Sequence, residues 1–468
     1  MAIIQDQEGV SFRELDRAAL RVALEVAGEV LGSVLEQLDE QLLHERDEER
    51  YSVKEIRKRQ VDTLVGSVGF SRRYYYDRAK GEYVALLDRV LGLDSGERVS
   101  PALTEVAVAQ GVRGPSYREA AQSLTEVFGY PLISHETIRR RVLATGDAIP
   151  REQRADPETP RGRRQVPLLY LEVDGHSVHM QSGERKRREA QLLFSHEGWR
   201  RRHPASEDYE LMGGRFYHRL ADPEADFWEE ASRYLYRDYD LSHTQVVING
   251  DRAAWIRQEV DYFPRAMYQV DRWHMVRDLR FLLRGTGQTR AALAAFYGDD
   301  PPGLLAALAT AEYRLPAGDK KVQLADLRRD LLLDPGMVRD YRDRLREQGY
   351  SVSGMRGMGA AESQVDRFKN RIRKRGQSWS KPGVMAMLHS LGQHLLGSLD
   401  RFTQRLSGET RLPLPDRQQR VQAATRKVVK RTLGVKQAHP PIKDAGRTRS
   451  GGMSRLLHQL GRARPSMT

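Results

Sequence analysis

The stretch VVINGDRAAWIRQEVDYFPRAMYQVDRWHMVRDL, residues 246–279, places a carboxylate at the end of two apolar runs. The first run ends at Asp251, and the second ends at Asp271, with His274 three residues further on. A third run, VPLLYLEVD, ends at Asp174. Each run has the length and apolar content of a buried strand, and ligands gather at the carboxyl ends of strands in open α/β sheets. The three aspartates therefore indicate a binding site, with a helix cap as the alternative for Asp251.

The segments on either side of this stretch predict a mixed sheet. VPLLYLEVD, AQLLFSHEGW and YELMGGRFYH are typical of three strands, and DPEADFWEEASRYLYRDYD is typical of a helix. Strand QVVING, helix DRAAWIRQEV, strand RAMYQVD and helix HMVRDLRFLL follow. This is the order of an RNase H-like domain, a mixed sheet with helices on both faces, although other α/β folds give a similar series.

The acidic residues suggest a site for hard divalent cations. Carboxylate oxygens suit Mg²⁺, and two such ions about 3.5–4 Å apart suit phosphodiester chemistry. Zinc is not expected, because the chain has no cysteine and its histidines form no H-E-x-x-H motif. We expect Asp174, Asp251 and a third acid to bind two Mg²⁺ (or Mn²⁺) ions.

Glu362 in GMGAAESQVDRFKNRIRKRG is the candidate for the third acid. It stands near the start of a predicted helix whose apolar positions Val365, Phe368 and Ile372 would dock on the sheet. A plain surface glutamate is the alternative. The basic neighbours expected to contact DNA phosphates include Lys369, Arg373 and Lys374.

The first part of the chain predicts a different kind of structure. Apolar positions recur at helical spacing from about residue 12 to 60, and a small β-hairpin is expected over 61–87. The hairpin carries Arg72 and Arg73 beside three tyrosines, which suits contact with a nucleic-acid backbone or a half-exposed sheet face equally well.

Two short helices are predicted next, in a helix-turn-helix-like arrangement. The first begins after Ser116 in a capping box with Glu119, and the second begins after Ser134 and is expected to end at Gly146. The second helix carries three consecutive arginines, which we expect to bind DNA: Arg139, Arg140 and Arg141. The residues from 148 to 165 are rich in proline, arginine and acids and predict a linker.

The composition favours a nucleic-acid partner in a reducing compartment. The chain of 468 residues has a formal charge of +13, from 77 lysines and arginines against 64 acids. It contains no cysteine, no apolar run long enough to span a bilayer, and no secretory signal at its start. We therefore expect a cytoplasmic protein that binds DNA and no membrane.

The chain resembles a family of bacterial insertion-sequence transposases. The residues that carry the likeness are LEVDGHSVHMQ around Asp174, HEGW, NGDRAAWI around Asp251, DRWH from Asp271 to His274, and AAESQV…RGQSWS around Glu362. GEYVALLDRVLGL is similar to the N-terminal region of the same family. These motifs resemble the ISLre-type transposases, which are related to the Mutator-like DDE transposases, over most of residues 60–385.

The resemblance implies an RNase H-like catalytic domain with a helical insertion before the last acid. Asp174, Asp251 and Glu362 would be the DDE metal ligands, and Asp271 and His274 would be auxiliary residues. Two positions differ from the family pattern. Further acids often follow the first aspartate, where this chain has Gly175 and His176, and glycine usually follows the second, where it has Arg252.

Together these features predict a multidomain α+β DNA transposase. It would cut DNA at the ends of an insertion sequence and transfer the freed 3′-hydroxyl to target DNA, as a homo-oligomer that recognises terminal inverted repeats. A nuclease without strand transfer and an inactive DNA-binding regulator are the alternatives. The expected regions are a helical N-terminus (1–60), a β-hairpin region (61–100), a helix-turn-helix-like region (101–150), a catalytic core (165–285), a helical insertion (286–355), the segment of the catalytic glutamate and the end of the core (356–400), and a basic tail (401–468).

Overall fold

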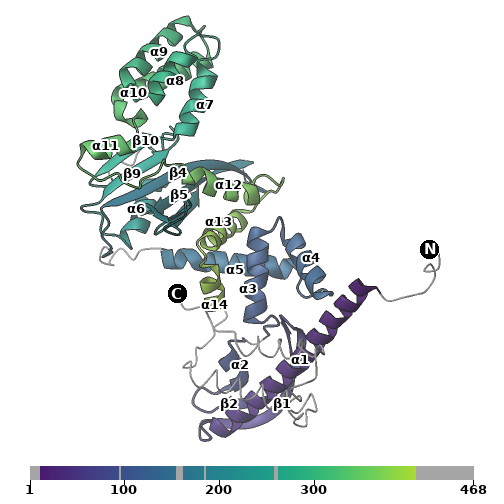
Figure 1. The fold of residues 1–468 in the computed structure, drawn as a ribbon. Coiled ribbons are helices and arrows are strands. Elements are labelled where there is room, and N and C mark those ends of the chain that lie inside the picture. Colours follow the sequence, from purple (N-terminus) through teal and green to yellow (C-terminus); the bar gives the residue numbers. More distant parts are fainter. Residues whose placement is uncertain (1–10, 94–95, 154–161, 184–185, 258–261, 407–468) are drawn as a thin grey trace, which may run out of the picture. The chain divides into compact units, whose positions relative to one another are not determined.

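The chain is an α+β protein that divides into two compact units. A computed structural model describes residues 11–93, 96–153, 162–183, 186–257 and 262–406 (Figure 1). The first unit comprises residues 1–108, 116–138 and 403–468, and the second comprises 109–115 and 139–402. None of the helices in the described part of the chain combines the length and apolar character that crossing a bilayer requires.

The first unit pairs a long helix with a three-stranded antiparallel sheet. Its elements are α1 (Phe12–Glu45), β1 (Tyr51–Thr63), β2 (Gly66–Asp77) and β3 (Glu82–Val84), and the strand order is β1-β2-β3. Leu35 of α1 packs against Val61, Val68 and Phe70 of the sheet. The predicted helix and hairpin are both present.

The boundary between this helix and the hairpin differs from the prediction. Residues 51–60 were expected to be helical, but they form most of β1 and pair with β2 from Tyr51 opposite Asp77 to Thr63 opposite Gly66. Helical spacing of apolar residues could not distinguish this segment, because most of its side chains are exposed in the strand as well. Pairing along the whole length of β2 decides its conformation.

Four helices follow the sheet, and the predicted helix starts are confirmed. They are α2 (Leu86–Leu91), α3 (Pro101–Arg113), α4 (Tyr117–Phe128) and α5 (His135–Gln153). The Ser116 hydroxyl accepts a hydrogen bond from the Glu119 amide at 3.1 Å, and Gly129 ends α4 in the left-handed conformation. The Ser134 hydroxyl accepts one from the Thr137 amide at 3.1 Å at the start of α5.

The predicted end of α5 at Gly146 is wrong, because the helix continues to Gln153. A Cβ atom at Gly146 would lie 2.3 Å from the Cα atom of Ala386 in α13 (Lys381–Leu395). Glycine at this position therefore permits close contact between two helices. The expected linker over 148–165 is shortened accordingly, and its residues 154–161 lie outside the described residues.

The same helix contact contains His389, which predicts acid sensitivity. Burial lowers the pKa of His389 to about 4, although the Gly146 carbonyl, 3.1 Å from Nδ1, opposes the shift. Unfolding returns the imidazole to a pKa of about 6.5, so the unfolded state binds more protons as the pH falls below 6.5. Protonation of His389 in the unfolded state should therefore lower the free energy of unfolding by about 2 kcal/mol at pH 5.

Urea unfolding of the wild type and His389→Gln at pH 7 and pH 5 measures this effect. The variant should lose less stability between the two pH values than the wild type. His203→Gln, at an exposed histidine, is the matched control and should behave as the wild type does. Equal pH dependence in all three proteins would contradict the role of His389.

The second unit contains a five-stranded mixed sheet. Its strands are β4 (Leu168–His179), β5 (Arg187–His196), β8 (Arg215–Leu220), β9 (Gln245–Gly250) and β10 (Ala266–Val270), in the order β10-β9-β4-β5-β8. β4, β9 and β10 run parallel, while β5 is antiparallel to β4 and β8 is antiparallel to β5. The third predicted strand, YELMGGRFYH, is divided between β8 and β7 (Tyr209–Leu211), which pairs separately with β6 (Trp199–Arg201).

The two faces of β4 point into different surroundings. Leu169, Leu171 and Val173 join the core formed with α6 (Phe227–Tyr236) and α7 (Arg272–Leu282). Side chains of the other face of the sheet meet α12 (Ala360–Ile372) and α13, for example through Phe216 and Phe368, whose ring centroids are 5.4 Å apart. Glu172 and Asp174 alternate with the core residues along β4.

The helix predicted directly after Asp251 is not present in the described residues. Residues 251–257 form turns, and residues 258–261 lie outside the described part of the chain. The Asp251 carboxylate accepts a hydrogen bond from the Ala253 amide at 2.9 Å, which stabilises a turn over residues 251–253. Asp251 is therefore not the cap of a helix over 251–257.

The segment predicted as a helical insertion is helical. It contains α8 (Thr289–Tyr297), α9 (Pro301–Arg314), α10 (Asp319–Leu333), the short 3₁₀ helix η2 (Pro335–Val338) and α11 (Tyr341–Glu347). Buried Phe296, Leu304 and Leu327 extend the apolar core of the sheet into these helices. Of the predicted basic tail, only the end of α14 (Leu399–Leu406) is described, and residues 407–468 lie outside the described part.

Candidate active site

Asp174 is a buried carboxylate in the middle of the central strand β4, which continues to His179 beyond the strand end predicted at Asp174. Its side chain is on β4, and the residue is only 7% exposed. The Asp174 Oδ2 atom lies 3.2 Å from the Lys369 Nζ atom, and Oδ1 accepts a hydrogen bond from the Gly175 amide at 2.7 Å. Burial raises the pKa of Asp174, and the charge of Asp251 adds to the rise while Lys369 opposes it.

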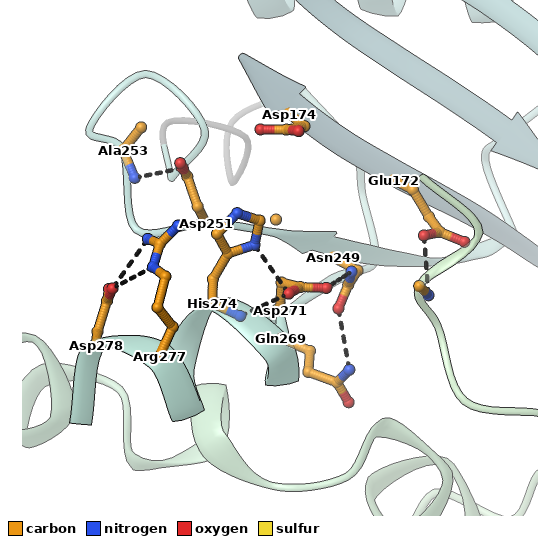
Figure 2. Close-up of polar contacts among 12 residues, drawn as sticks. Glu172, Asp174, Asn249, Asp251, Ala253, Gln269, Asp271, His274, Arg277 and Asp278 are labelled. Carbon is orange, nitrogen blue, oxygen red and sulfur yellow. Dashed lines mark hydrogen bonds and ion pairs between the residues drawn. The ribbon is translucent and has the colours of Figure 1, made fainter. Parts of the chain in front are cut away.

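Asp251 directly follows β9, the strand beside β4. β9 is parallel to β4, and Val173 with Gly250 is the last residue pair between them, so an aspartate follows this pair on each side. Figure 2 shows both carboxylates at this end of the sheet. The structure thus brings together two of the three predicted ligands.

Asp271 and His274 form a hydrogen-bonded pair at the start of α7. The Asp271 Oδ1 atom accepts hydrogen bonds from the His274 amide and from the Nδ1 atom of its ring, both at 2.9 Å (Figure 2). Asp271 is the N-cap of α7. Burial opposes ionisation of both groups, but their mutual hydrogen bonding lowers the pKa of Asp271 and, with the charges of Asp271 and Asp174, raises the pKa of His274.

Glu189 is a further acidic residue near the two aspartates, and it was missed in the sequence. It lies on β5, and a Cβ atom at Gly175 would be 2.3 Å from its Oε1 atom. Partial burial raises the pKa of Glu189, and the charges of Asp251 and Asp174 raise it further. Gly175 leaves the space that the Glu189 carboxylate fills.

Glu172 connects β4 to the helix that carries Glu362. The Glu172 Oε2 atom accepts a hydrogen bond from the amide of Gly359, the N-cap of α12, at 3.1 Å (Figure 2). Its Oε1 atom lies 3.3 Å from the Nε2 atom of His196 on β5, and both side chains are fully buried. This pair was also missed, although a glutamate inside the apolar run LLYLEV is a visible signal.

Glu362 lies in the first turn of α12, as predicted. Its side chain, like that of Val365, is outside the described residues, while Phe368 and Ile372 are fully buried as the predicted docking stripe requires. α12 begins at Gly359, which is hydrogen-bonded to β4 two residues before Asp174. The backbone of the Glu362 helix is thus held close to the strand of Asp174.

The basic residues of α12 have different environments. Lys369 binds Asp174, Lys374 binds Asp366 at 2.6 Å, and Arg373 is exposed. Arg371 is 4% exposed and donates hydrogen bonds to the carbonyls of Gly111 and Val112. Arg371 therefore has a structural role.

The arginines predicted to bind DNA in the N-terminal half also differ among themselves. Arg72 is 7% exposed and forms an ion pair with Asp88 at 2.8 Å, which corrects the expectation that it faces a phosphate. Arg73 forms an ion pair with Asp39 at 2.8 Å and is half-buried. Arg139 and Arg140 are exposed on α5, and Arg141 is half-buried.

The donor chemistry at Asp174 and Asp251 fits a hard cation. The site offers carboxylate oxygens, and the ammonium of Lys369 already occupies a cation position at Asp174. Among the described side chains, no three acidic or histidine groups lie close enough together to hold a metal ion. A complete metal site therefore needs a ligand in addition to these, and the Glu362 side chain is not among the described ones.

Comparisons with known proteins identify related sequences. A sequence model of a family described as uncharacterised protein family UPF0236 matches residues 5–405. The UPF0236 protein in vanSb 3'region of Streptococcus gallolyticus is 27% identical over 347 residues, 72% of this chain and 73% of that protein. A UPF0236 protein of Caldanaerobacter subterraneus subsp. tengcongensis, whose name joins eleven locus designations, is 21% identical over 245 residues.

The extent of these matches varies. The Caldanaerobacter alignment covers 52% of this chain and 48% of the relative, so the chain spans about half the length of that protein. Among solved structures, the Drosophila P element transposase strand transfer complex matches with 10% identity and a TM-score of 0.23, over 73% of this chain and 93% of that chain. The range matched by the family model contains Asp174, Asp251 and all of α12.

Proposed function

This chain belongs to the uncharacterised protein family UPF0236, and from that premise we propose that it is a DDE-type DNA transposase. The observation that carries the proposal is the pair of aspartates, Asp174 in β4 and Asp251 directly after β9, which both follow the last residue pair between these parallel strands. A carboxylate pair in this position suits metal-dependent cleavage of phosphodiesters. The two carboxylates, and not the fold alone, support this function, since one fold can carry many activities.

The topology of the second unit supports an RNase H-like interpretation. Its sheet has β4 at the centre, and β5 alone runs antiparallel to the other four strands of this sheet, while both aspartates follow the last residue pair between β4 and β9. In chain order the sheet is three strands, a helix and two further strands, followed by α7 and a helical insertion. The series of strands has the predicted order, but the helix predicted between β9 and β10 is not present in the described residues.

The proposed roles follow from the chemistry of each residue. Asp174, Asp251 and Glu362 would hold two Mg²⁺ (or Mn²⁺) ions, which when bound supply an activated nucleophile and stabilise the leaving oxygen. Lys369 keeps the Asp174 carboxylate paired with a cation until metal binds. Glu172 holds the start of α12, so that the Glu362 backbone lies beside the strand of Asp174.

Two further observations support a mobile-element protein that binds DNA. One relative carries eleven locus designations of a single strain, and a protein encoded at many loci of one genome is typical of an insertion sequence. The net charge of +13 and the exposed Arg139, Arg140 and Arg373 suit contact with phosphates. Synapsis of two DNA ends requires a homo-oligomer on DNA in this proposal.

A strand-transfer assay tests the proposal directly. The full chain is incubated with Mg²⁺, a target plasmid and DNA fragments that carry the sequences flanking the gene. We expect 3′-end cleavage and joined products with the wild type and neither with Asp251→Asn, while both proteins bind the fragments. Asp326→Asn, at an exposed aspartate of α10, is the matched control and should act as the wild type does.

Other results of this assay would overturn the proposal. Cleavage by the wild type without joining, lost in Asp251→Asn, would identify a nuclease. Binding of the fragments by both proteins with no chemistry in either would identify a DNA-binding regulator. Chemistry that is unchanged in Asp251→Asn would exclude the assigned site.

A further inference from the structure

Two buried amide side chains cross the sheet beside the candidate active site. Asn249 on β9 and Gln269 on β10 stand directly opposite each other in the parallel register, and each is 2% exposed. A buried amide costs free energy unless its polar atoms find partners. Their presence inside the apolar runs QVVING and AMYQVD therefore calls for a specific role.

The hydrogen bonds of these amides run in one direction. The backbone amide of Tyr341 can only donate, so the Gln269 oxygen accepts from it at 2.7 Å. The Gln269 NH₂ group then donates to the Asn249 oxygen at 3.1 Å, and the Asn249 NH₂ group donates to the Asp271 Oδ2 atom at 3.2 Å (Figure 2). The orientation of both amides thus follows from the backbone donor at the far end.

The backbone donor at that end is firmly held. Tyr341 is 1% exposed and begins α11, which Asp340 caps by accepting a hydrogen bond from the Arg342 amide at 3.0 Å. The Arg344 guanidinium ties the same helix to β10 through the carbonyl of Tyr268, at 2.6 Å. The chain of amides therefore starts from a rigid part of the structure.

At the other end, Asp271 determines the state of His274. One carboxylate oxygen of Asp271 is taken by Asn249, and the other accepts from the His274 amide and faces its Nδ1 atom. A carboxylate accepts only, so Nδ1 carries the proton and Nε2 is the nitrogen left to interact with other groups. Figure 2 places the His274 ring on the side of Asp251 and Asp174.

We propose that Asn249 and Gln269 are positioning residues that hold Asp271 and, through it, fix His274 so that Nε2, the acceptor nitrogen, accepts a hydrogen bond from the attacking water or 3′-hydroxyl at the cleavage site. The DNA substrate in this inference rests on the proposed function, whereas the positioning of His274 does not. The uncharged side-chain amides of Gln269 and Asn249 donate in series towards Asp271, and this keeps the His274 imidazole in one tautomer and one orientation. Outer residues of this kind typically change activity by about tenfold or more when removed.

The test uses a glutamine in the same sheet as its control. Gln269→Met keeps the shape of the side chain but removes both hydrogen bonds. Gln245→Met makes the same change at a residue of β9 that is 6% exposed and whose NH₂ group bonds the Val246 carbonyl, 3.2 Å away. ¹⁵N NMR of the histidine-labelled full chain reports the tautomer, and the His274 signal is assigned by its loss in His274→Asn.

We expect His274 to carry its proton on Nδ1 in the wild type and in Gln245→Met, and to populate both tautomers in Gln269→Met. In the strand-transfer assay, Gln269→Met should cleave about tenfold more slowly with an unchanged Kd for the DNA fragments. If Gln269→Met does not fold, Asn249→Ser replaces it in both measurements, because the shorter side chain reaches neither neighbour.

The two readouts separate the inference from the proposed function. A proton on Nε2 in the wild type, or the same tautomer and cleavage rate in Gln269→Met as in the wild type, would overturn the positioning role. A tautomer change in Gln269→Met with no DNA chemistry in the wild type would support the positioning of His274 while rejecting the transposase.

Discussion

Asp174→Asn should reduce DNA cleavage by about 1,000-fold, or about 4 kcal/mol of activation free energy, without lowering the stability of the protein. The loss is expected because asparagine supplies no negative charge to hold a divalent cation. Stability should be kept or raised, since Asp174 is buried near Asp251 and Glu189 and its ionised form is disfavoured there. The ion pair with Lys369, which is 25% exposed, offsets only part of that cost.

Cleavage rates and urea unfolding at several pH values measure both expectations. Because its pKa is raised in the folded state, ionisation of Asp174 lowers the free energy of unfolding at neutral pH. This loss disappears as the pH falls towards 3.8. The stability advantage of Asp174→Asn should therefore be greatest at pH 7 and shrink in acid. Lys369→Met is the companion variant and should be less stable than the wild type. An Asp174→Asn protein several kcal/mol less stable than the wild type at pH 7 would show that this aspartate is structural.

Much of the second unit could be predicted from local sequence patterns. Continuous apolar runs identify β4, β5, β9 and β10, because a strand that is buried on both faces has apolar residues at most positions and not at every second one. The position of Asp251 directly after β9 follows from the same runs, whereas β4 continues past Asp174 to His179. The capping residues Ser116 and Ser134 are equally local signals, and both helix starts are confirmed.

Features that depend on tertiary contacts could not be predicted in this way. Gly146 is a typical helix-ending residue by itself, and only the approach of Ala386 in a distant helix explains why α5 continues. The sequence predicts a helix over residues 51–60, because the spacing of their apolar side chains does not reveal that they pair with β2. The same is true of Arg72, whose partner Asp88 lies 16 residues away in another element.

The residues of the candidate site also divide into those that local sequence predicts and those that only tertiary contacts bring to the site. Asp174 and Asp251 both follow the last residue pair between β4 and β9, whereas Glu189 approaches them only through the register of β5 on β4 and the missing side chain of Gly175. Asp271 and His274 are three residues apart, so their pairing is local. Buried polar residues inside strands, such as Glu172 and Asn249, indicate specific hydrogen bonds, but the apolar residues around them make the segments look like ordinary core strands.

Glu172→Leu should have the largest effect on stability of the changes considered, with a loss of about 3 kcal/mol in unfolding free energy. The Gly198 amide donates to the Nδ1 atom of His196 at 3.2 Å, so the proton of this ring is on Nε2, facing Glu172. Leucine would leave that buried N–H without an acceptor and would remove the hydrogen bond of the Gly359 amide. Both donors lose their partner in a single substitution.

Unfolding and hydrogen exchange of Glu172→Leu and Glu172→Gln distinguish a general loss of packing from the loss of this anchor. Glutamine has one acceptor oxygen and one donor group, so it can serve either His196 or Gly359 but not both, and its cost should be about half that of leucine. Amides in the first turn of α12 should exchange faster in Glu172→Leu, since Gly359 no longer ties that turn to β4. Glu210→Leu, at a partly exposed glutamate of β7, is the matched control and should leave both measurements unchanged. If glutamine proved as costly as leucine while exchange in α12 stayed at the wild-type rate, the charge of Glu172, and not its two acceptor oxygens, would be what stabilises this part of the fold.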